Sequence, residues 1–300
     1  MKSLIDYLKD LFHVNVSDDT EWTLGLLSIS VQELHTMKRF YTKILGLSVL
    51  QQHNDMLLLG IANGSVPLLK LVKRSSKQVF TSSESNLYSF AFKLPKQKQM
   101  GSLVNHLLLE DKVINASSDD GYSEAIYLLD PEGNRVKVYW DKPQAQHKSS
   151  DPAYREGTNT QIELDYFLKL GGEPYQAIPQ GTILGQVHLS VTSLEKSESF
   201  YTSILPFKTT LDYLFKRKNL VMNHNHYSLS FNEWLADKDF VFPGDQKVQC
   251  LTLMAPSIRD MQMLAERLEE ANYVYDYKDG DLFFKDPNHI PIQITVRDKA

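Results

Sequence analysis

The sequence predicts an α+β protein of four βαβββ modules, and an internal repeat is the main observation behind this prediction. Two segments 160 residues apart share seven identities within about 22 positions, in one register and without a gap. Self-similarity at a fixed spacing is the signature of a repeated structural unit. Within each copy, the apolar residues follow first the period of a strand and then that of a helix. The shared residues are Leu24-Gly25, Leu34, Phe40-Tyr41 and Ile44-Leu45, which recur as Leu184-Gly185, Leu194, Phe200-Tyr201 and Ile204-Leu205.

The first module begins with a strand over about 26–31, where serine alternates with apolar residues. A helix over about 34–44 follows, because apolar residues recur there at helical spacing and Gly46 lies just past its end. Two or three further strands complete the module, in the apolar runs 56–59 and 66–72.

The second module has the same order of elements and contains a recognisable turn. In that turn, Pro131 presets the first φ angle and Gly133 supplies the positive φ that reverses the chain into a hairpin. Asp130-Pro131 recurs as Asp286-Pro287, so the fourth module (249–296) copies the second, as the third (184–234) copies the first. The expected elements of the second module are a strand over 87–94, a helix over 99–109, and strands over 125–129 and 135–140.

The repeat also sets the expected domain boundaries. A polar stretch between the two halves has the composition of a linker, with a short helix expected over 161–170 before Gly171-Gly172. The predicted units are an N-terminal segment (1–23), a first domain of two modules (24–140), the linker (141–181) and a second domain of two modules (182–300).

Composition and charge exclude several classes of protein. The chain has 300 residues, 42% hydrophobic and 23% charged, with a net charge of −5, which gives no electrostatic reason to expect nucleic acid or an anionic membrane as partner. Its single cysteine, Cys250, excludes an internal disulfide framework. No apolar run approaches 18 residues and the first residues lack a signal-peptide core, so a cytoplasmic location is expected.

Two stretches carry a resemblance to a known family: LGQVHLSVTSLEKSESFYTSIL at 184–205 and EAIYLLDPEGNRVKVYWDKP at 124–143. With four βαβββ modules, they resemble the vicinal oxygen chelate superfamily of glyoxalases, bleomycin-resistance proteins and extradiol dioxygenases. Within it, the chain is most similar to bacterial four-module proteins like catechol-2,3-dioxygenase, over about 24–296. The resemblance implies paired, cup-shaped mixed sheets that bind Fe(II) or Mn(II) through two histidines and a glutamate, and ring cleavage of an aromatic diol.

The expected metal ligands are only partly present. The resemblance makes His188 a metal ligand, at the place where the first module has Ser28. The second histidine is replaced by Ser89 and the glutamate by Lys137; a hydroxyl is a poor ligand and an ammonium has no lone pair to offer. Whether a cup pairs modules one and two or modules two and three stays open. The matching positions of the fourth module are Cys250 and Gln293.

Relatives also have a run of histidines before Asn-x-Trp, which supplies acid–base groups beside the substrate. Here only His226 matches that run, which makes it the candidate catalytic residue. Alternation places His224 on the same face, and Trp234 ends the motif, so both are expected to line the pocket. Asp120 replaces a loop histidine of the family, and with His188 and His226 it would give a relocated two-histidine, one-carboxylate site. Alternation adds Ser228, Ser230 and Asn232 to that face.

Two functions therefore follow from the resemblance. The first is an extradiol dioxygenase-like protein with an altered metal site. The second is a metal-free protein of the same fold that binds or sequesters a small molecule, as bleomycin-resistance proteins do. If Lys137 faces the cup with Ser89, its charge disfavours a divalent ion and favours a small aromatic or anionic ligand such as a phenolate or carboxylate. The substrate, the identity of the metal and homo-oligomer formation stay open.

Overall fold

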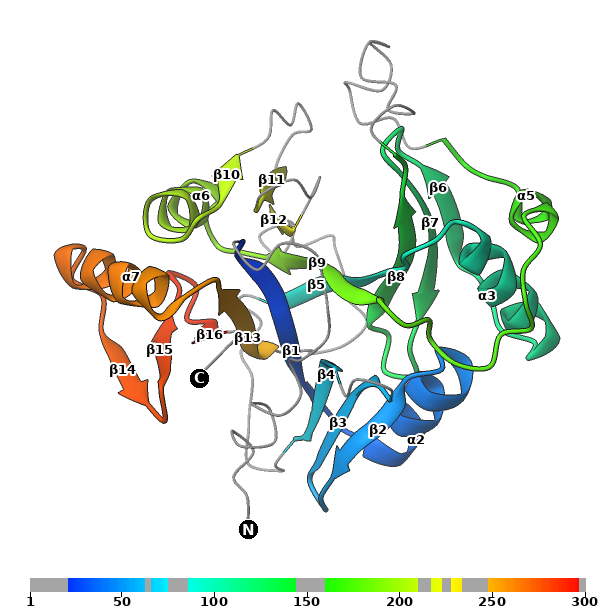
Figure 1. Cartoon of the computed structure of the whole chain (residues 1–300), viewed down its shortest axis with the longest axis horizontal. Helices are drawn as coiled ribbons and strands as arrows, with labels where there is room; N and C mark the ends of the chain where they lie inside the picture. The colour runs from blue at the N-terminus through cyan, green and yellow to red at the C-terminus, as the bar shows by residue number, and fades with distance from the viewer. Residues whose placement is uncertain are drawn as a thin grey trace.

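The computed structural model describes residues 21–62, 66–74, 86–143, 160–209, 217–222, 228–233 and 248–296, whose strands form two eight-stranded mixed sheets (Figure 1). The predicted α+β class is confirmed. Sheet A runs in the order β14 (Tyr275–Lys278), β15 (Asp281–Lys285), β16 (Pro291–Val296), β13 (Val248–Ala255), β1 (Thr23–Val31), β4 (Val66–Lys73), β3 (Met56–Ile61) and β2 (Ser48–Gln52). Sheet B runs in the order β10 (Lys208–Thr209), β11 (Arg217–Val221), β12 (Leu229–Asn232), β9 (Ile183–Ser190), β5 (Asn86–Lys93), β8 (Arg135–Asp141), β7 (Ser123–Leu129) and β6 (Ala116–Asp119).

The order of the strands settles which modules pair. In sheet B the antiparallel contact between β5 and β9 joins the second module to the third. In sheet A the antiparallel contact between β1 and β13 joins the first module to the fourth. Each sheet therefore takes four strands from each half of the chain.

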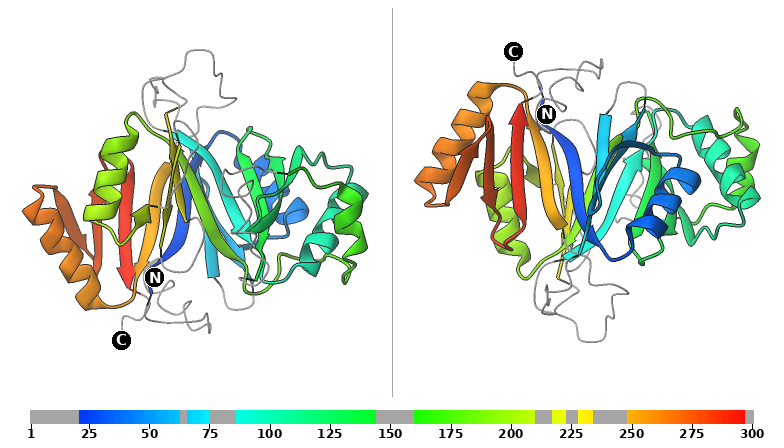
Figure 2. Two further views of the ribbon diagram at one scale, coloured as in Figure 1. Left: turned by 90° about the horizontal axis from the view of Figure 1, so that it is seen from above. Right: turned by 90° about the horizontal axis from the view of Figure 1, so that it is seen from below.

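The helices lie at the two ends of the strand layers. In Figure 2, helices α6 and α7 lie at one end and helices α2, α3 and α5 at the other, with the strands between them. The expected helix over 34–44 is divided, because its second part is wound as a π-helix, η1, whereas the other expected helices lie close to their predicted bounds. The helices are α2 (Leu34–Arg39), η1 (Phe40–Ile44), α3 (Lys98–Leu109), α5 (Leu164–Lys169), α6 (Leu194–Ser203) and α7 (Ile258–Glu270).

One apolar core contains residues from the central strands of both sheets. Because side chains alternate along a strand, the residues between these apolar positions face the opposite side of each sheet. The polar positions of β9, including His188, are therefore turned away from the core. Fully or almost fully buried core residues of the four central strands include Leu27 and Ile29, Phe90 and Phe92, Val187 and Leu189, and Leu251 and Leu253.

Hydrogen bonds between a tyrosine and an aspartate join modules that are neighbours in the sequence. The Tyr41 hydroxyl of η1 donates to Asp130 Oδ2 at 2.7 Å, and the Tyr201 hydroxyl of α6 donates to Asp286 Oδ2 at 3.1 Å. Both aspartates begin the turn that the sequence predicts, in which Gly133 has φ 82°. The repeated Phe-Tyr and Asp-Pro pairs are thus two halves of one contact, which occurs twice in the chain.

The burial of Asp130 at this contact makes stability depend on pH. Burial raises the pKa of Asp130 from 3.8 to about 6, and hydrogen bonds from Tyr41 and the turn oppose that rise. A carboxyl whose pKa is higher in the folded protein holds its proton there more firmly, so its contribution to stability is complete below about pH 4 and is lost as the pH rises through about 6. The free energy of unfolding should fall by up to about 3 kcal/mol over this interval. In urea titrations, Asp130→Asn should lose this part of the pH dependence; an unchanged slope would contradict the assignment.

The described helices include none that is long and apolar enough to cross a membrane. Of the predicted N-terminal segment (1–23), residues 1–20 lie outside the described ranges.

Candidate functional site

A row of polar residues crosses five strands of sheet B on the face turned away from the core. His188 on β9 lies opposite Ser89 on β5 and opposite Ser230 on β12. Ser89 is paired in turn with Arg135 on β8, and Ser230 with Asn219 on β11. We call these five residues the polar row, and the face of sheet B that carries it the cup. The second and third modules both contribute to it.

A bulge in β5 brings an aromatic ring into this row. The register between β5 and β9 shifts between Leu87 and Ser89, so Tyr88 is the additional residue. Bulges of this kind redirect side chains. The ring centroid of Tyr88 lies 4.5 Å from that of His188, and Arg135 Cζ lies 4.4 Å from the same tyrosine ring. The Tyr88 ring therefore contacts both a cation and the imidazole.

The imidazole of His188 is buried and held in its neutral form. Asn232 Nδ2 lies 2.9 Å from His188 Nε2, and Asn232 Oδ1 accepts a hydrogen bond from the Ser190 hydroxyl at 2.6 Å. With the amide oriented in this way, Nε2 is the acceptor and the proton sits on Nδ1. Burial lowers the pKa of His188 well below its usual range, and the positive charges of Arg217, Arg135 and Lys137 lower it further.

A second chain of hydrogen bonds forms the floor of the cup. Gln186 Nε2 donates to the Ser230 hydroxyl at 2.9 Å, and that hydroxyl donates to Asn219 Oδ1 at 2.6 Å. Arg217 Nε donates to the same Asn219 oxygen at 3.2 Å. Ser228 is 2% exposed and lies two residues before Ser230 on the same face; among the described residues its hydroxyl has no hydrogen-bond partner.

Lys137 faces the cup. It follows Arg135 by two residues on β8, its Nζ lies 4.6 Å from the centroid of the Tyr139 ring, and it lines a small cavity together with Gln186 and Asp120. This cavity has a volume of about 10 Å³, which is about enough for one water molecule. Lys137, Arg135 and Arg217 are all half-buried, so their charges remain within reach of a ligand.

Asp120 is engaged in its own loop. Its Oδ1 accepts from the backbone amides of Tyr122 at 3.0 Å and Ser123 at 2.5 Å, and its Oδ2 accepts from the Ser123 hydroxyl at 2.9 Å. The carboxylate thus stabilises the loop while one side of it lines the cavity with Lys137. Three further candidate residues, His224, His226 and Trp234, lie outside the described ranges.

The described residues do not fit a divalent metal ion. Among them, no group of three or more His, Cys, Asp and Glu side chains could hold one. The Nε2 atom of His188 accepts a hydrogen bond from the Asn232 amide. On the neighbouring strand His188 faces the neutral Ser89, and the next member of the polar row is Arg135. Fe(II) and Mn(II) prefer imidazole and carboxylate ligands, which this row does not supply together.

The corresponding face of sheet A does not supply a better donor set. Ser28 lies opposite Cys250 on β13 and opposite Lys70 on β4. Burial raises the pKa of Cys250 to about 11, so the sulfur stays a thiol at neutral pH. Gln293 accepts from the Thr252 hydroxyl at 3.2 Å and donates to an oxygen of Asp281 at 3.0 Å.

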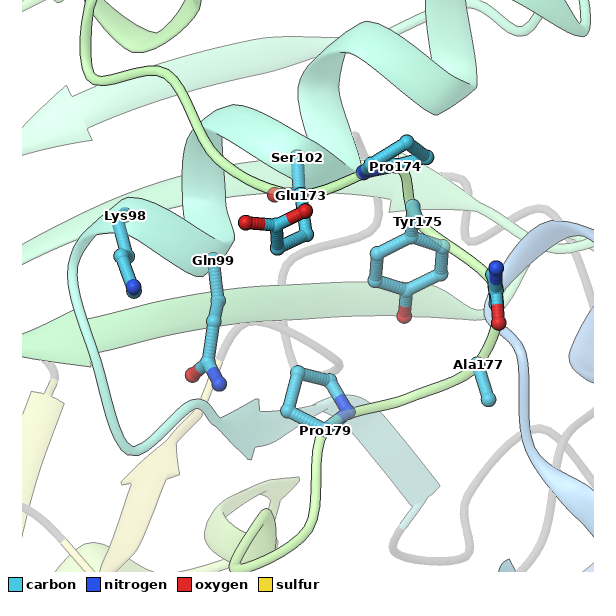
Figure 3. A pocket seen from close by; sticks show the side chains of 9 residues that line it. Lys98, Gln99, Ser102, Glu173, Pro174, Tyr175, Ala177 and Pro179 are labelled. Carbon is cyan, nitrogen blue, oxygen red and sulfur yellow. The ribbon is translucent and has the colours of Figure 1, made fainter.

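Another pocket lies beside the N-terminal end of α3, where the segment 173–179 passes (Figure 3). Lys98 and Glu173, which have opposite charges, both line it. Tyr175 anchors the segment, because its hydroxyl donates to the Leu45 carbonyl at 2.8 Å and its ring stacks on His106. The pocket therefore lies where the linker packs against the first two modules.

Sequence reasoning identified only part of this site. It named His188, Ser89 and Lys137, which the structure places on one face, with Lys137 one row away from the other two. It missed Arg135, which alternation along β8 could have revealed, because Arg135 and Lys137 are two residues apart. It also missed Tyr88, Arg217 and the hydrogen bond from the Asn232 side-chain amide to His188. All three depend on pairing between strands.

The sequence is similar to a known family model and to a catechol-2,3-dioxygenase. Residues 23–138 match the family model described as Glyoxalase/Bleomycin resistance protein/Dioxygenase superfamily. A catechol-2,3-dioxygenase of Bacillus subtilis (strain 168) is 27% identical over 277 residues, which are 91% of this chain and 96% of that protein.

Solved structures show the same fold at low sequence identity. A candidate dioxygenase of Bacillus subtilis superposes with a TM-score of 0.62 at 12% identity, covering 93% of this chain and 86% of that chain. The cppA protein of Streptococcus pneumoniae TIGR4 gives a TM-score of 0.56 at 14% identity, covering 94% of this chain and 100% of the other. Glyoxalase I of Zea mays gives a TM-score of 0.55 at 13% identity, covering 92% of each chain. At these identities the likeness shows the fold alone.

Proposed function

Because residues 23–138 match the model of the glyoxalase, bleomycin-resistance and dioxygenase superfamily, and 91% of the chain aligns with a catechol-2,3-dioxygenase, we propose that the chain binds a small molecule in the cup of sheet B without a divalent metal at His188. The expected ligand set is altered: Ser89 and Lys137 stand where the resemblance implies a histidine and a glutamate. The cup itself is retained, with its buried polar floor and its half-buried rim.

The observation that carries this proposal is the charge around His188. Arg135 and Lys137 on β8 and Arg217 on β11 all place positive charge near the imidazole and depress its pKa. Like charges repel, and the repulsion is stronger at the effective dielectric of a protein site than in water. A divalent cation at His188 would meet this repulsion, and it would also have to displace the Asn232 amide from Nε2.

A second candidate function is extradiol ring cleavage with Fe(II) or Mn(II). It is favoured by the similarity to catechol-2,3-dioxygenase, which extends over 91% of this chain, and by the presence of His188 at the expected ligand position. In that case His224 or His226 would have to complete the ligand set, and the imidazole of His188 would have to exchange its amide partner for the metal. The metal would then hold the diol and dioxygen together.

Metal content separates the two functions. Protein purified without a chelator or a metal-affinity tag should contain well below one equivalent of Fe or Mn per chain. Added Fe(II) or Mn(II) should leave its melting temperature unchanged. About one equivalent of either metal, lost in His188→Ala but kept in the matched variant of the exposed His35, His35→Ala, would overturn the proposal. Oxygen uptake with catechol would then establish ring cleavage.

A further inference from the structure

Cationic side chains flank the cup on two opposite sides. Arg135 and Lys137 come from β8 in the second module, and Arg217 comes from β11 in the third. Between these two strands lie β5, β9 and β12, which carry Ser89, His188 and Ser230 of the polar row. The two sides therefore face a common floor, whose groups are neutral.

Two of these cations are not neutralised within the described part of the chain. Lys137 contacts the Tyr139 ring and Arg217 donates to the Asn219 amide oxygen, but no described carboxylate lies within salt-bridge distance of either. Other basic residues of this sheet do form ion pairs. Lys218, which follows Arg217 on the opposite face of β11, lies 2.9 Å from Glu198, and Lys93 lies 2.6 Å from Asp141.

A buried hydroxyl on the same floor provides an independent observation. Ser228 is 2% exposed, and its hydroxyl has no partner among the described residues. A buried polar group without a hydrogen bond is costly and therefore uncommon, and a ligand atom is one ordinary explanation for it. A hydroxyl can donate to the oxygen of a carboxylate or phenolate.

We propose that the cup of sheet B binds a small organic anion, a carboxylate or a phenolate, whose charge is held by Lys137 and Arg135 on one side and Arg217 on the other. Ser228 donates to an oxygen of this ligand. The inference rests on the proposed function, since it assigns the class of ligand to the same metal-free cup. The proposed site has the opposite charge pattern to a metal site, because the protein supplies the positive charges and the ligand supplies the negative charge.

Calorimetric titration with three probes of similar size and different charge tests this class. Salicylate should bind, neutral catechol should bind at least tenfold more weakly, and cationic benzylamine should not bind. Salicylate affinity should fall as salt is added, because exposed and half-buried charges are screened. Equal affinities for salicylate and catechol, or no binding of salicylate at millimolar concentration, would overturn the inference.

Variants locate the site. Lys137→Gln and Arg217→Gln should each weaken salicylate binding at least tenfold, whereas Lys218→Gln, which removes the same charge from the other face of β11, should change it less than twofold. Ser228→Ala should weaken binding several-fold and leave the melting temperature unchanged or higher, because it removes an unpaired buried hydroxyl. If all three cup variants bind like the parent, salicylate binds elsewhere and the inference is wrong.

The same titration distinguishes the two proposals. If binding of salicylate requires bound Fe or Mn and disappears after chelation, the proposed metal-free function fails and the anion site fails with it. If the protein is metal-free but binds the three probes without regard to their charge, only the anion site fails. Because the probe series uses the parent protein, a variant that does not fold leaves the test intact.

Discussion

Replacing Asp130 with alanine should lower the free energy of unfolding by about 3–5 kcal/mol, because several buried donors lose their acceptor at once. The carboxylate accepts from the Tyr41 hydroxyl at 2.7 Å, from the Glu132 amide at 3.0 Å and from the Asn134 amide at 2.8 Å. Tyr41 is completely buried and Asn134 is 2% exposed, so water does not replace the lost acceptor. Chemical denaturation monitored by circular dichroism measures the change.

A graded pair of variants tests the hydrogen bonds. Asp130→Asn keeps one of the two acceptor oxygens and should cost less than Asp130→Ala, because only the donors to the other oxygen lose their acceptor. Asp286→Ala removes the equivalent contact with Tyr201 in the second half and should cost a similar amount. A loss below about 1 kcal/mol for both alanine variants, which is typical of ordinary surface positions, would show that these contacts do not hold the modules together.

Replacing Gly185 with alanine should destabilise the protein by about 3 kcal/mol and also weaken anion binding, because the new methyl group meets a buried ring. A Cβ at Gly185 would lie 2.2 Å from Tyr139 Oη and 2.9 Å from Lys93 Cβ. Tyr139 is only 6% exposed, and Lys137 Nζ lies over its ring. The ring has to move, and the ammonium that rests on it moves with it.

The repeat supplies the control for this variant. Gly25 occupies the same place in the first module, but a Cβ there would first meet Met254 Cγ at 3.0 Å, in a flexible side chain. Gly25→Ala should therefore cost less than about 1 kcal/mol. Equal losses of stability for Gly25→Ala and Gly185→Ala, measured by urea titration, would contradict the role assigned to Tyr139.

The modules of the fold could be predicted from the sequence, but their partners could not. The apolar periods at 26–31 and 34–44 describe contacts within a module, and these appear in the structure as β1 and as α2 with η1. The pairing of β1 with β13 depends on which strand edges meet, and either pairing of modules would bury the same apolar faces. Local periodicity carries no information about that choice.

The candidate site shows the same division. Alternation along a strand was enough to place Ser228, Ser230 and Asn232 on one face, and Leu229 and Phe231 between them are indeed buried in the core. Tyr88 could not be found in this way, because strict alternation assigns it to the side opposite Ser89. The bulge that turns its ring toward His188 is a property of the pairing between β5 and β9.

Each sheet joins one module from the first half of the chain to one from the second half, and this pairing has a consequence for the origin of the chain. A polypeptide with only the first two modules would contain strands for half of each sheet, and would complete both sheets only by associating with a second copy about a two-fold axis. In such a homodimer each sheet would straddle the subunit boundary, while the tyrosine–aspartate contacts would remain within each subunit. The present molecule corresponds to that dimer with its two subunits fused head to tail. After fusion the two halves can differ in sequence. His188 in the third module and Ser28 at the equivalent position of the first are one such difference.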